Sequence, residues 1–246
     1  VVRELLLFRA ESAVGRREPN AGRADAEHAL EASVVAGDEH HEGKARRFLG
    51  QIAQMSGKLT EARRELSRSV DIFGELGDDI ELAASLRERG FSEVFGGSLA
   101  DADWLLGEAE ALSEQLNDRR GRAWVRQHQA WVAFLSGDLE LAEKRLLLAS
   151  GEFSDLGDRS GSNWATGLLA YIRFFTMHFD EAEALAHAVR GEGLELGERW
   201  SPAMMDSLLA SIRLWTGNFV EAERLSRRAL GEFRSLDDKF GLVQAL

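Results

Sequence analysis

A pattern of small, apolar and turn-forming positions repeats along the chain with a spacing of 40 residues. A glycine column is occupied by Gly57, Gly97, Gly137 and Gly217, with Met177 at the remaining step. Two residues later stands a large apolar column, formed by Leu59, Leu99, Leu139, Phe179 and Phe219. Three residues further lies an alanine column, formed by Ala62, Ala102, Ala142, Ala182 and Ala222. A fixed period of this kind indicates a repeat architecture.

Two further columns keep the same register. Seven residues before the glycine column stands a small residue, at Gly50, Gly90, Ala130, Ala170 and Ala210. Late in each repeat a leucine precedes a polar turn, at Leu76, Leu116, Leu156, Leu196 and Leu236. Glycine tolerates positive φ at a helix C-terminus, and aspartate can cap the next helix, so both turns of the repeat are predicted to separate helices.

Each repeat is therefore predicted to fold as two helices, A and B. In one repeat, helix A is expected near residues 123–136 and helix B near 139–156, where apolar side chains recur with helical spacing. The small columns suit a close crossing of A and B, because a larger side chain would push the helix axes apart. One hairpin cannot bury both of its faces, so neighbouring hairpins are expected to stack.

The order of a small residue, then Gly-x-[Leu/Phe]-x-x-Ala, then a Leu-Gly-Asp turn resembles the tetratricopeptide repeat (TPR). The best matches are Gly137-Asp138-Leu139-Glu140-Leu141-Ala142 and Gly217-Asn218-Phe219-Val220-Glu221-Ala222. The chain departs from the family in its 40-residue period, against the usual 34, and in lacking the proline after helix B. This longer form resembles the arrays of large bacterial regulators, which sit beside a nucleotide-switch ATPase and a DNA-binding or cyclase domain. The resemblance implies a sensor or partner-docking role.

The expected fold is thus an all-α, right-handed superhelix of helix hairpins, forming one TPR-like domain over residues 1–246. The repeats are assigned to residues 41–80, 81–120, 121–160, 161–200 and 201–240, after a degenerate first repeat at 1–40 that carries Pro19 and Gly22. Residues 240–246 resemble the first turns of a further hairpin. Because the chain also lacks a starting methionine, we expect it to be a fragment of a longer protein.

The resemblance also implies that the A helices line a concave groove, with the second, fifth, ninth and twelfth positions of each directed into it. The candidate partner-binding residues are Arg47, Arg87, Phe91, Trp124, Gln127, Trp131, Phe134, Trp164, Tyr171 and Phe174. Aromatic side chains are frequent anchors at binding surfaces, and arginine can hold a carboxylate bidentately. This set predicts a partner segment, extended or helical, with an apolar anchor and an acidic end; a small-molecule effector stays open.

Both parts of this set have a plainer interpretation. Apolar residues at helical spacing usually form core, and a shift of one residue would turn Trp131 or Phe134 inward. The arginines could lie on a solvated helix face with partners four residues away.

The composition narrows the class of function. The formal charge of −12 makes binding of nucleic acid or an anionic membrane by this segment unfavourable. The absence of cysteine excludes disulfides, thiolate metal sites and cysteine nucleophiles, and fits a reducing compartment. No apolar run reaches transmembrane length and no signal peptide precedes the repeats, so we expect a cytoplasmic location.

No catalytic residue, metal site or cofactor is predicted. Residues 38–42 include His40 and His41, but adjacent histidines in a turn do not converge on one ion. The paired acids at the repeat turns are expected to cap helices, and Gly191-Glu192-Gly193 is too short for a phosphate fingerprint. We therefore expect no enzyme but a scaffold that binds a protein or ligand in a bacterial cytoplasmic regulator. The alternative is a structural spacer or oligomerisation arm with no ligand in the groove.

Overall fold

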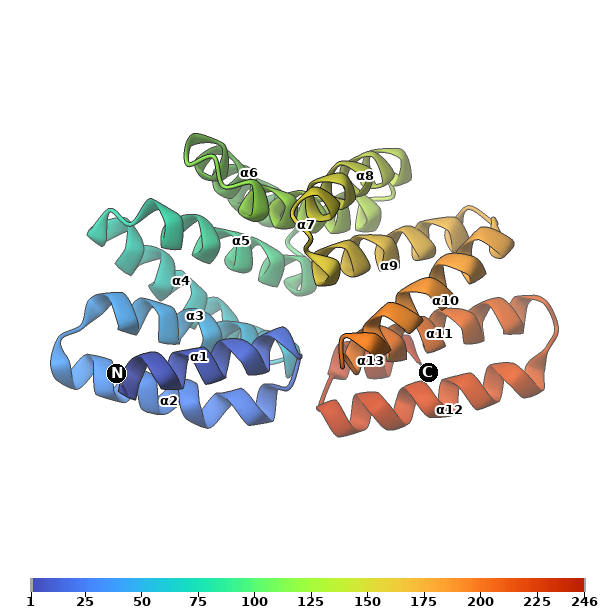
Figure 1. The fold of residues 1–246 in the computed structure, drawn as a ribbon, viewed down its shortest axis with the longest axis horizontal. Coiled ribbons are helices and arrows are strands. Elements are labelled where there is room, and N and C mark those ends of the chain that lie inside the picture. Colours follow the sequence, from blue (N-terminus) through green and yellow to red (C-terminus); the bar gives the residue numbers. More distant parts are fainter. Residues whose placement is uncertain (1, 246) are drawn as a thin grey trace. The chain divides into compact units, whose positions relative to one another are not determined.

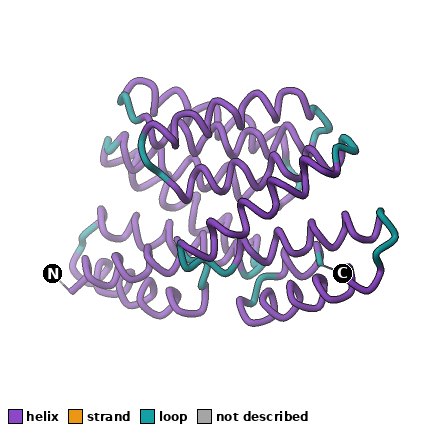
Figure 2. The backbone as a smooth tube through the Cα atoms, turned by 45° about the vertical axis from the view of Figure 1, so that its right-hand side comes forward, coloured by secondary structure: helices purple, strands orange, loops and turns teal. Residues whose placement is uncertain are grey.

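The computed structural model describes residues 2–245, so the first and last residues of the predicted domain lie outside the described range. Every regular element in this range is an α-helix (Figures 1 and 2). The thirteen helices of residues 2–245 are α1 (Val2–Gly15), α2 (Pro19–Ala36), α3 (Glu39–Met55), α4 (Leu59–Leu76), α5 (Asp79–Gly96), α6 (Leu99–Gln115), α7 (Arg119–Leu135), α8 (Leu139–Asp155), α9 (Arg159–Phe175), α10 (Phe179–Glu195), α11 (Trp200–Trp215), α12 (Phe219–Leu236) and α13 (Lys239–Gln244). The predicted all-α array of helix hairpins is confirmed.

The helices form two compact units, residues 1–132 (unit 1) and 133–246 (unit 2). Odd-numbered helices correspond to helix A of the repeat and even-numbered ones to helix B. Within unit 1, α1 packs on α2, α3 on α4 and α5 on α6; within unit 2, α9 packs on α10 and α11 on α12. Figure 1 shows α11 and α12 side by side, joined at one end by a short loop. The degenerate first repeat also forms a hairpin.

Both turn columns adopt the left-handed backbone conformation. After each A helix the φ angle is positive at Gly57, Gly97, Gly137, Met177 and Gly217. After each B helix it is positive at Gly77, Asn117, Gly157, Gly197 and Asp237. A residue in this conformation ends a helix because its N–H turns back to the last helical carbonyls, and glycine adopts it without steric cost. The glycine column of the sequence thus marks the ends of the A helices, including the step where methionine replaces glycine.

The turn aspartates cap the helices that follow them. The Asp38 carboxylate accepts a hydrogen bond from the His41 backbone N–H at 3.2 Å, and Asp158 accepts one from Gly161 at 2.9 Å. The same cap recurs at Asp78, Asp118, Asp138, Asn218 and Asp238. Each cap satisfies one of the backbone donors that a helix start leaves unpaired. The capping role predicted for these acids is confirmed.

The small columns lie where the helices of a hairpin cross. A Cβ atom added to Gly50 would come within 2.4 Å of Leu66 Cγ, and one added to Gly90 would come within 2.9 Å of Leu106 Cγ. The alanine column is also buried, since Ala62, Ala102, Ala142 and Ala182 have no solvent exposure. The predicted register of the repeat is therefore confirmed at its tightest contacts.

Successive A helices also pack on one another. In unit 1, α1 contacts α3 and α3 contacts α5; in unit 2, α9 contacts α11 and α11 contacts α13. Among the described residues of each unit, the B helices of neighbouring hairpins approach each other much less closely. A stack that is tighter on one side bends toward that side, so the A helices lie on the concave side of each unit. No helix in the described part of the chain is both long and apolar enough to cross a membrane.

Candidate partner-binding face

The basic residues predicted for unit 1 already have carboxylate partners. Arg47 Nη1 donates to Glu81 Oε2 at 2.5 Å, and Lys44 Nζ lies 2.7 Å from Glu81 Oε1. These pairs connect α3 to the next A helix, α5. Arg87 Nη2 donates to Glu88 Oε1 at 2.7 Å within α5. The arginines therefore do not lie on a solvated face with partners four residues away, and a carboxylate of this chain already balances the charge of each.

A buried polar and aromatic cluster lies beneath these pairs, where α5 meets α7. The His128 ring stacks on Phe91 with 3.9 Å between ring centroids, and Trp124 lies 6.0 Å from the same histidine. Burial lowers the pKa of His128 to about 3, so the ring is neutral at pH 7. Burial alone would raise the pKa of Glu88, but the neighbouring Arg87 guanidinium holds this pKa below its usual value.

Three of the predicted residues in unit 1 lie inside rather than on the surface. Phe91 is 5% exposed, Trp131 8% and Gln127 not at all. Trp124 is half-buried, as are Arg47 and Arg87. Neither amide atom of Gln127 has a hydrogen-bond partner in the described part of the chain, and burying such a group unpaired is costly. The A-helix face of unit 1 thus consists mainly of ion pairs over a closed interior.

The predicted residues of unit 2 are more open. Trp164, Tyr171 and Phe174 are half-buried and pack against the core of the unit, with part of each ring exposed. The Tyr171 hydroxyl donates to the Met204 carbonyl at 3.2 Å, which fixes the ring between α9 and α11. Phe134, also half-buried, lies 5.5 Å from Phe175 between ring centroids.

Two aromatic residues of this face were missed by the sequence analysis. Trp200, at the start of α11, is buried with 8% of its surface exposed, and it supports Trp164 by stacking on it with 4.7 Å between ring centroids and 9° between ring planes. Phe175 ends α9 with 57% of its surface exposed, beside Phe174 at 5.4 Å. Neither occupies a position that the family pattern directs into the groove. Adjacent aromatic letters at 174–175 were the available signal for Phe175; Trp200 had none.

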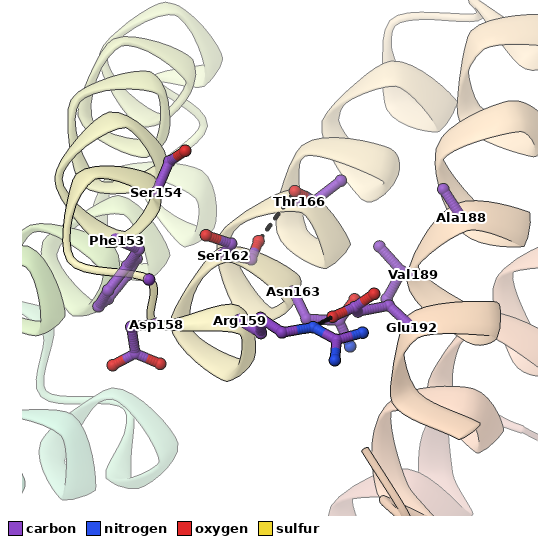
Figure 3. A pocket seen from close by; sticks show the side chains of 11 residues that line it. Phe153, Ser154, Asp158, Arg159, Ser162, Asn163, Thr166, Ala188, Val189 and Glu192 are labelled. Carbon is purple, nitrogen blue, oxygen red and sulfur yellow. Dashed lines mark hydrogen bonds and ion pairs between the residues drawn. The ribbon is translucent and has the colours of Figure 1, made fainter. Parts of the chain in front are cut away.

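Unit 2 also contains a cavity, and the ion pairs in its wall recur from one repeat to the next. A cavity of about 350 Å³ lies between α8, α9 and α10, with Arg159, Asn163 and Glu192 on one wall and Phe153 on another (Figure 3). Arg159 donates to Glu192 and Glu195, and one repeat later Arg199 donates to Glu232 and Ser235. Each of these bridges joins the start of an A helix to the following B helix. Because the bridge recurs with the 40-residue period, it does not mark a unique site.

The histidines of residues 38–42 do not gather around one point. His41 Nδ1 lies 3.0 Å from Asp38 Oδ1, whereas His40 Nε2 lies 3.3 Å from Asp78 Oδ2. Over residues 2–245, no three His, Asp or Glu side chains come together in a way that could hold a metal ion.

No protein-family model matches the sequence, and no curated protein matches it. Solved structures match through their fold. A Rap protein complexed with competence and sporulation factor aligns with a TM-score of 0.75 at 13% identity, covering 99% of this chain and 72% of that chain. BtubC (BKLC) from P. vanneervenii gives 0.62 at 14% identity, with 96% and 93% covered. A putative kinesin light chain from Podosopora anserina with nearly identical TPR-like repeats gives 0.54 at 18% identity, with 78% and 94% covered. The chain therefore has a TPR-like solenoid fold, and these likenesses concern the fold alone.

Proposed function

We propose that this chain is an interaction scaffold that binds a peptide or protein segment along its A helices, chiefly those of unit 2. The TPR-like fold supports the proposal, because stacked helix pairs present an extended concave surface. One protein that shares the fold was solved in complex with competence and sporulation factor. The observation that carries the proposal is the partly exposed aromatic surface of α9.

That surface, which we call the aromatic face, consists of Trp164, Tyr171, Phe174 and Phe175 on α9. The buried Trp200 of α11 stacks against Trp164 and supports it. The rings of the aromatic face are held by contacts with each other and with the core, so they lose little conformational freedom on binding. Rigid aromatic side chains that bury a large area are the usual energetic centres of protein interfaces. An apolar side chain of a partner segment fits this chemistry.

The charge distribution restricts the rest of the partner. The net charge of −12 favours a neutral or basic segment. The sequence analysis also expected an acidic end that meets Arg47 and Arg87. Because Glu81 and Glu88 already neutralise these arginines, an acidic partner would have to displace a carboxylate from each. We therefore propose an apolar anchor with neutral or basic flanks.

The biological setting follows from the sequence resemblance. We propose that the chain is the sensor or docking part of a bacterial cytoplasmic regulator, without catalytic activity of its own. A regulator needs a segment whose binding changes the state of a neighbouring domain, and a solenoid offers such a surface without its own chemistry.

A spacer is the second candidate, and unit 1 favours it. Its A-helix face is closed by ion pairs between α3 and α5 and by the burial of Phe91 and Trp131. A face filled by its own side chains needs no ligand. On this account, unit 1 would support and extend the array while unit 2 binds the partner.

Selection of peptides tests the proposal. A library of random peptides displayed on phage would be selected on the intact chain, and the affinities of the recovered peptides would be measured by fluorescence anisotropy. Phe174→Ala and Phe175→Ala remove rings of the aromatic face. We expect each to weaken binding at least tenfold, or about 1.4 kcal/mol, as for a residue near the centre of an interface.

Trp104→Ala is the matched control. Trp104 is 64% exposed on α6, a B helix of unit 1, so its truncation removes an exposed aromatic side chain away from the A helices. Peptides that bind Trp104→Ala as well as the parent but lose affinity for the two phenylalanine variants would support the proposal. Recovered peptides that bind all variants alike would refute it, and failure to recover any peptide would favour the spacer.

A further inference from the structure

Four arginines surround a small cavity in unit 2 whose lining shares no residue with the aromatic face. The cavity has a volume of about 160 Å³ and is lined by residues of α10, α11 and α12. It is lined by His187, Arg190, Leu209, Arg213, Glu221, Arg224, Leu225 and Arg228. We call this set the arginine pocket.

Carboxylates hold these arginines in place, but there are fewer carboxylates than guanidinium groups. The Asp206 carboxylate, 2% exposed, accepts hydrogen bonds from Arg190 and from Arg228. Arg213 pairs with Glu183, and Arg224 donates to Glu221 at 2.6 and 2.7 Å. Four guanidinium groups thus face three carboxylates, so the pocket carries a net positive charge on a chain whose total charge is −12.

The arginines keep donors for a further acceptor. A guanidinium group has five N–H bonds. Within residues 2–245, Arg190 donates only through Nε, and Arg224 and Arg228 each donate through Nε and Nη2. Because the buried Asp206 fixes Arg190 and Arg228 from below, their remaining N–H groups are oriented before any ligand arrives, which lowers the entropic cost of binding.

Comparison with the preceding repeat shows that this arrangement exceeds what the fold requires. The positions 40 residues before His187, Arg190, Arg224 and Arg228 are Leu147, Ser150, Ala184 and Ala188. The position before Asp206 is Thr166. Only the Arg213–Glu183 pair has a counterpart, in Arg173 and Glu143. The hairpin stack therefore forms without the other three arginines, and their gathering at one cavity calls for another cause.

We propose that the arginine pocket binds a tetrahedral, doubly charged oxyanion, namely a phosphoryl group. Arginine binds phosphate oxygens in pairs of parallel hydrogen bonds. The cavity is smaller than the 300–1,000 Å³ typical of sites for drug-sized ligands, so it accepts a single anionic group and not a nucleotide. The group is either free phosphate or the phosphorylated side chain of a partner. This inference does not depend on the proposed function of the A helices.

The test follows the arginine Nε–H resonances of the intact chain by NMR during titration with inorganic phosphate, N-acetyl-O-phosphoserine amide and acetate. We expect saturable shifts with both phosphoryl compounds, at least tenfold weaker binding of acetate, and weaker binding at high salt. The tighter of the two phosphoryl compounds identifies the source of the group. Arg224→Gln should weaken phosphoryl binding at least tenfold, and it leaves the fold intact because Arg224 is 57% exposed.

Arg227→Gln is the matched control. Arg227 is 77% exposed, pairs with Glu223 and does not line the cavity, although it precedes Arg228 in the chain. We expect this variant to bind phosphoryl compounds within twofold of the parent. The proposal is overturned by the absence of saturable shifts, by acetate binding as tightly as phosphate, or by equal losses in Arg224→Gln and Arg227→Gln, since an equal loss indicates diffuse attraction.

Discussion

Single residues decide how each helix of this repeat ends. The left-handed position after the A helix is glycine in four repeats, Met177 in another and Arg17 in the degenerate first repeat. A side chain with a Cβ atom is strained there, because the Cβ approaches the following carbonyl oxygen. Met177 has φ of 65° and its side chain is 61% exposed, so the strain is not offset by burial of the methionine.

Replacing Met177 with glycine is expected to stabilise the protein. Relief of the left-handed strain, less the greater entropy of glycine in the unfolded chain, gives a gain of about 0.5–1 kcal/mol. Urea denaturation would measure it. Asn117→Gly, at the corresponding position of a B helix, should gain less, because asparagine tolerates this conformation. An unchanged or lowered free energy of unfolding in Met177→Gly would contradict the assignment.

A second property at the residue scale is the neutral, buried His128. Its folded-state pKa of about 3 lies below the usual 6.5. Between these values the unfolded chain binds a proton that the folded chain does not, so the free energy of unfolding falls as the pH falls. The slope reaches about 1.4 kcal/mol per pH unit. Carboxylates with lowered pKa values add their own loss below about pH 4.5, so the range from pH 6.5 to about pH 5 isolates the histidine.

His128→Gln is therefore expected to flatten the dependence of stability on pH between pH 6.5 and about pH 5, whatever its effect on stability at pH 7. Urea denaturation at a series of pH values gives the slope. His187→Gln, which makes the same replacement at a side chain that is 59% exposed, serves as the control for the substitution itself. The same slope in parent and His128→Gln would show that His128 does not titrate as the structure implies.

At the scale of elements, a cross-repeat ion pair recurs with its charges exchanged. In unit 2, Glu143 pairs with Arg173 and Glu183 with Arg213, each joining a B helix to the next A helix. In unit 1 the same two columns hold Arg63 and Glu93, paired at 2.5 Å. The repeat geometry thus conserves the distance between the two positions and not the sign at either one.

Exchange of one such pair is expected to be tolerated. Arg173→Glu alone places a carboxylate opposite Glu143 and should cost about 1 kcal/mol, since the pair is partly exposed. Adding Glu143→Arg restores an attractive pair and should recover most of that loss. A double-mutant cycle followed by thermal denaturation measures the coupling. Additive losses would mean that the two positions do not interact.

The hairpin crossing supplies the most direct test of the repeat register. Ala142 has no exposed surface, whereas Lys144, two residues later on α8, is exposed. Ala142→Trp should overpack the crossing and cost about 1–3 kcal/mol or more. Lys144→Trp introduces the same side chain on the solvent side and should change stability by less than about 0.5 kcal/mol. Similar melting temperatures for the two variants would rule out the register.

The sequence predicted the elements well because their signals are local. For one repeat it placed helix A near 123–136 and helix B near 139–156, and the structure has α7 at Arg119–Leu135 and α8 at Leu139–Asp155. The candidate face was harder, because exposure on an A helix depends on how closely the neighbouring A helix packs. Phe91 and Trp131 satisfy the family pattern, yet lie in the interior of unit 1. The ion pair of Arg47 was missed for the same reason, since Glu81 lies on another helix.

At the scale of the whole molecule, each unit is held together by contacts between successive helices. Stability in such stacks is close to a sum of hairpin terms and nearest-neighbour interfaces. Function has no comparable local signature. The aromatic face needs the rings of α9 and their support by the buried Trp200 of α11, and the arginine pocket needs charges from α10, α11 and α12. Both sets become visible only when the helices are in place.

The proposed function requires that a partner segment lies against the A helices of unit 2. Hydrogen–deuterium exchange of the intact chain, with and without a peptide selected on it, tests this claim most directly. We expect slower exchange at the amides of α9 and α11 when the peptide is bound, with α4 and α6 of unit 1 unchanged. Slower exchange confined to B helices, or no change anywhere with a peptide that demonstrably binds, would contradict it.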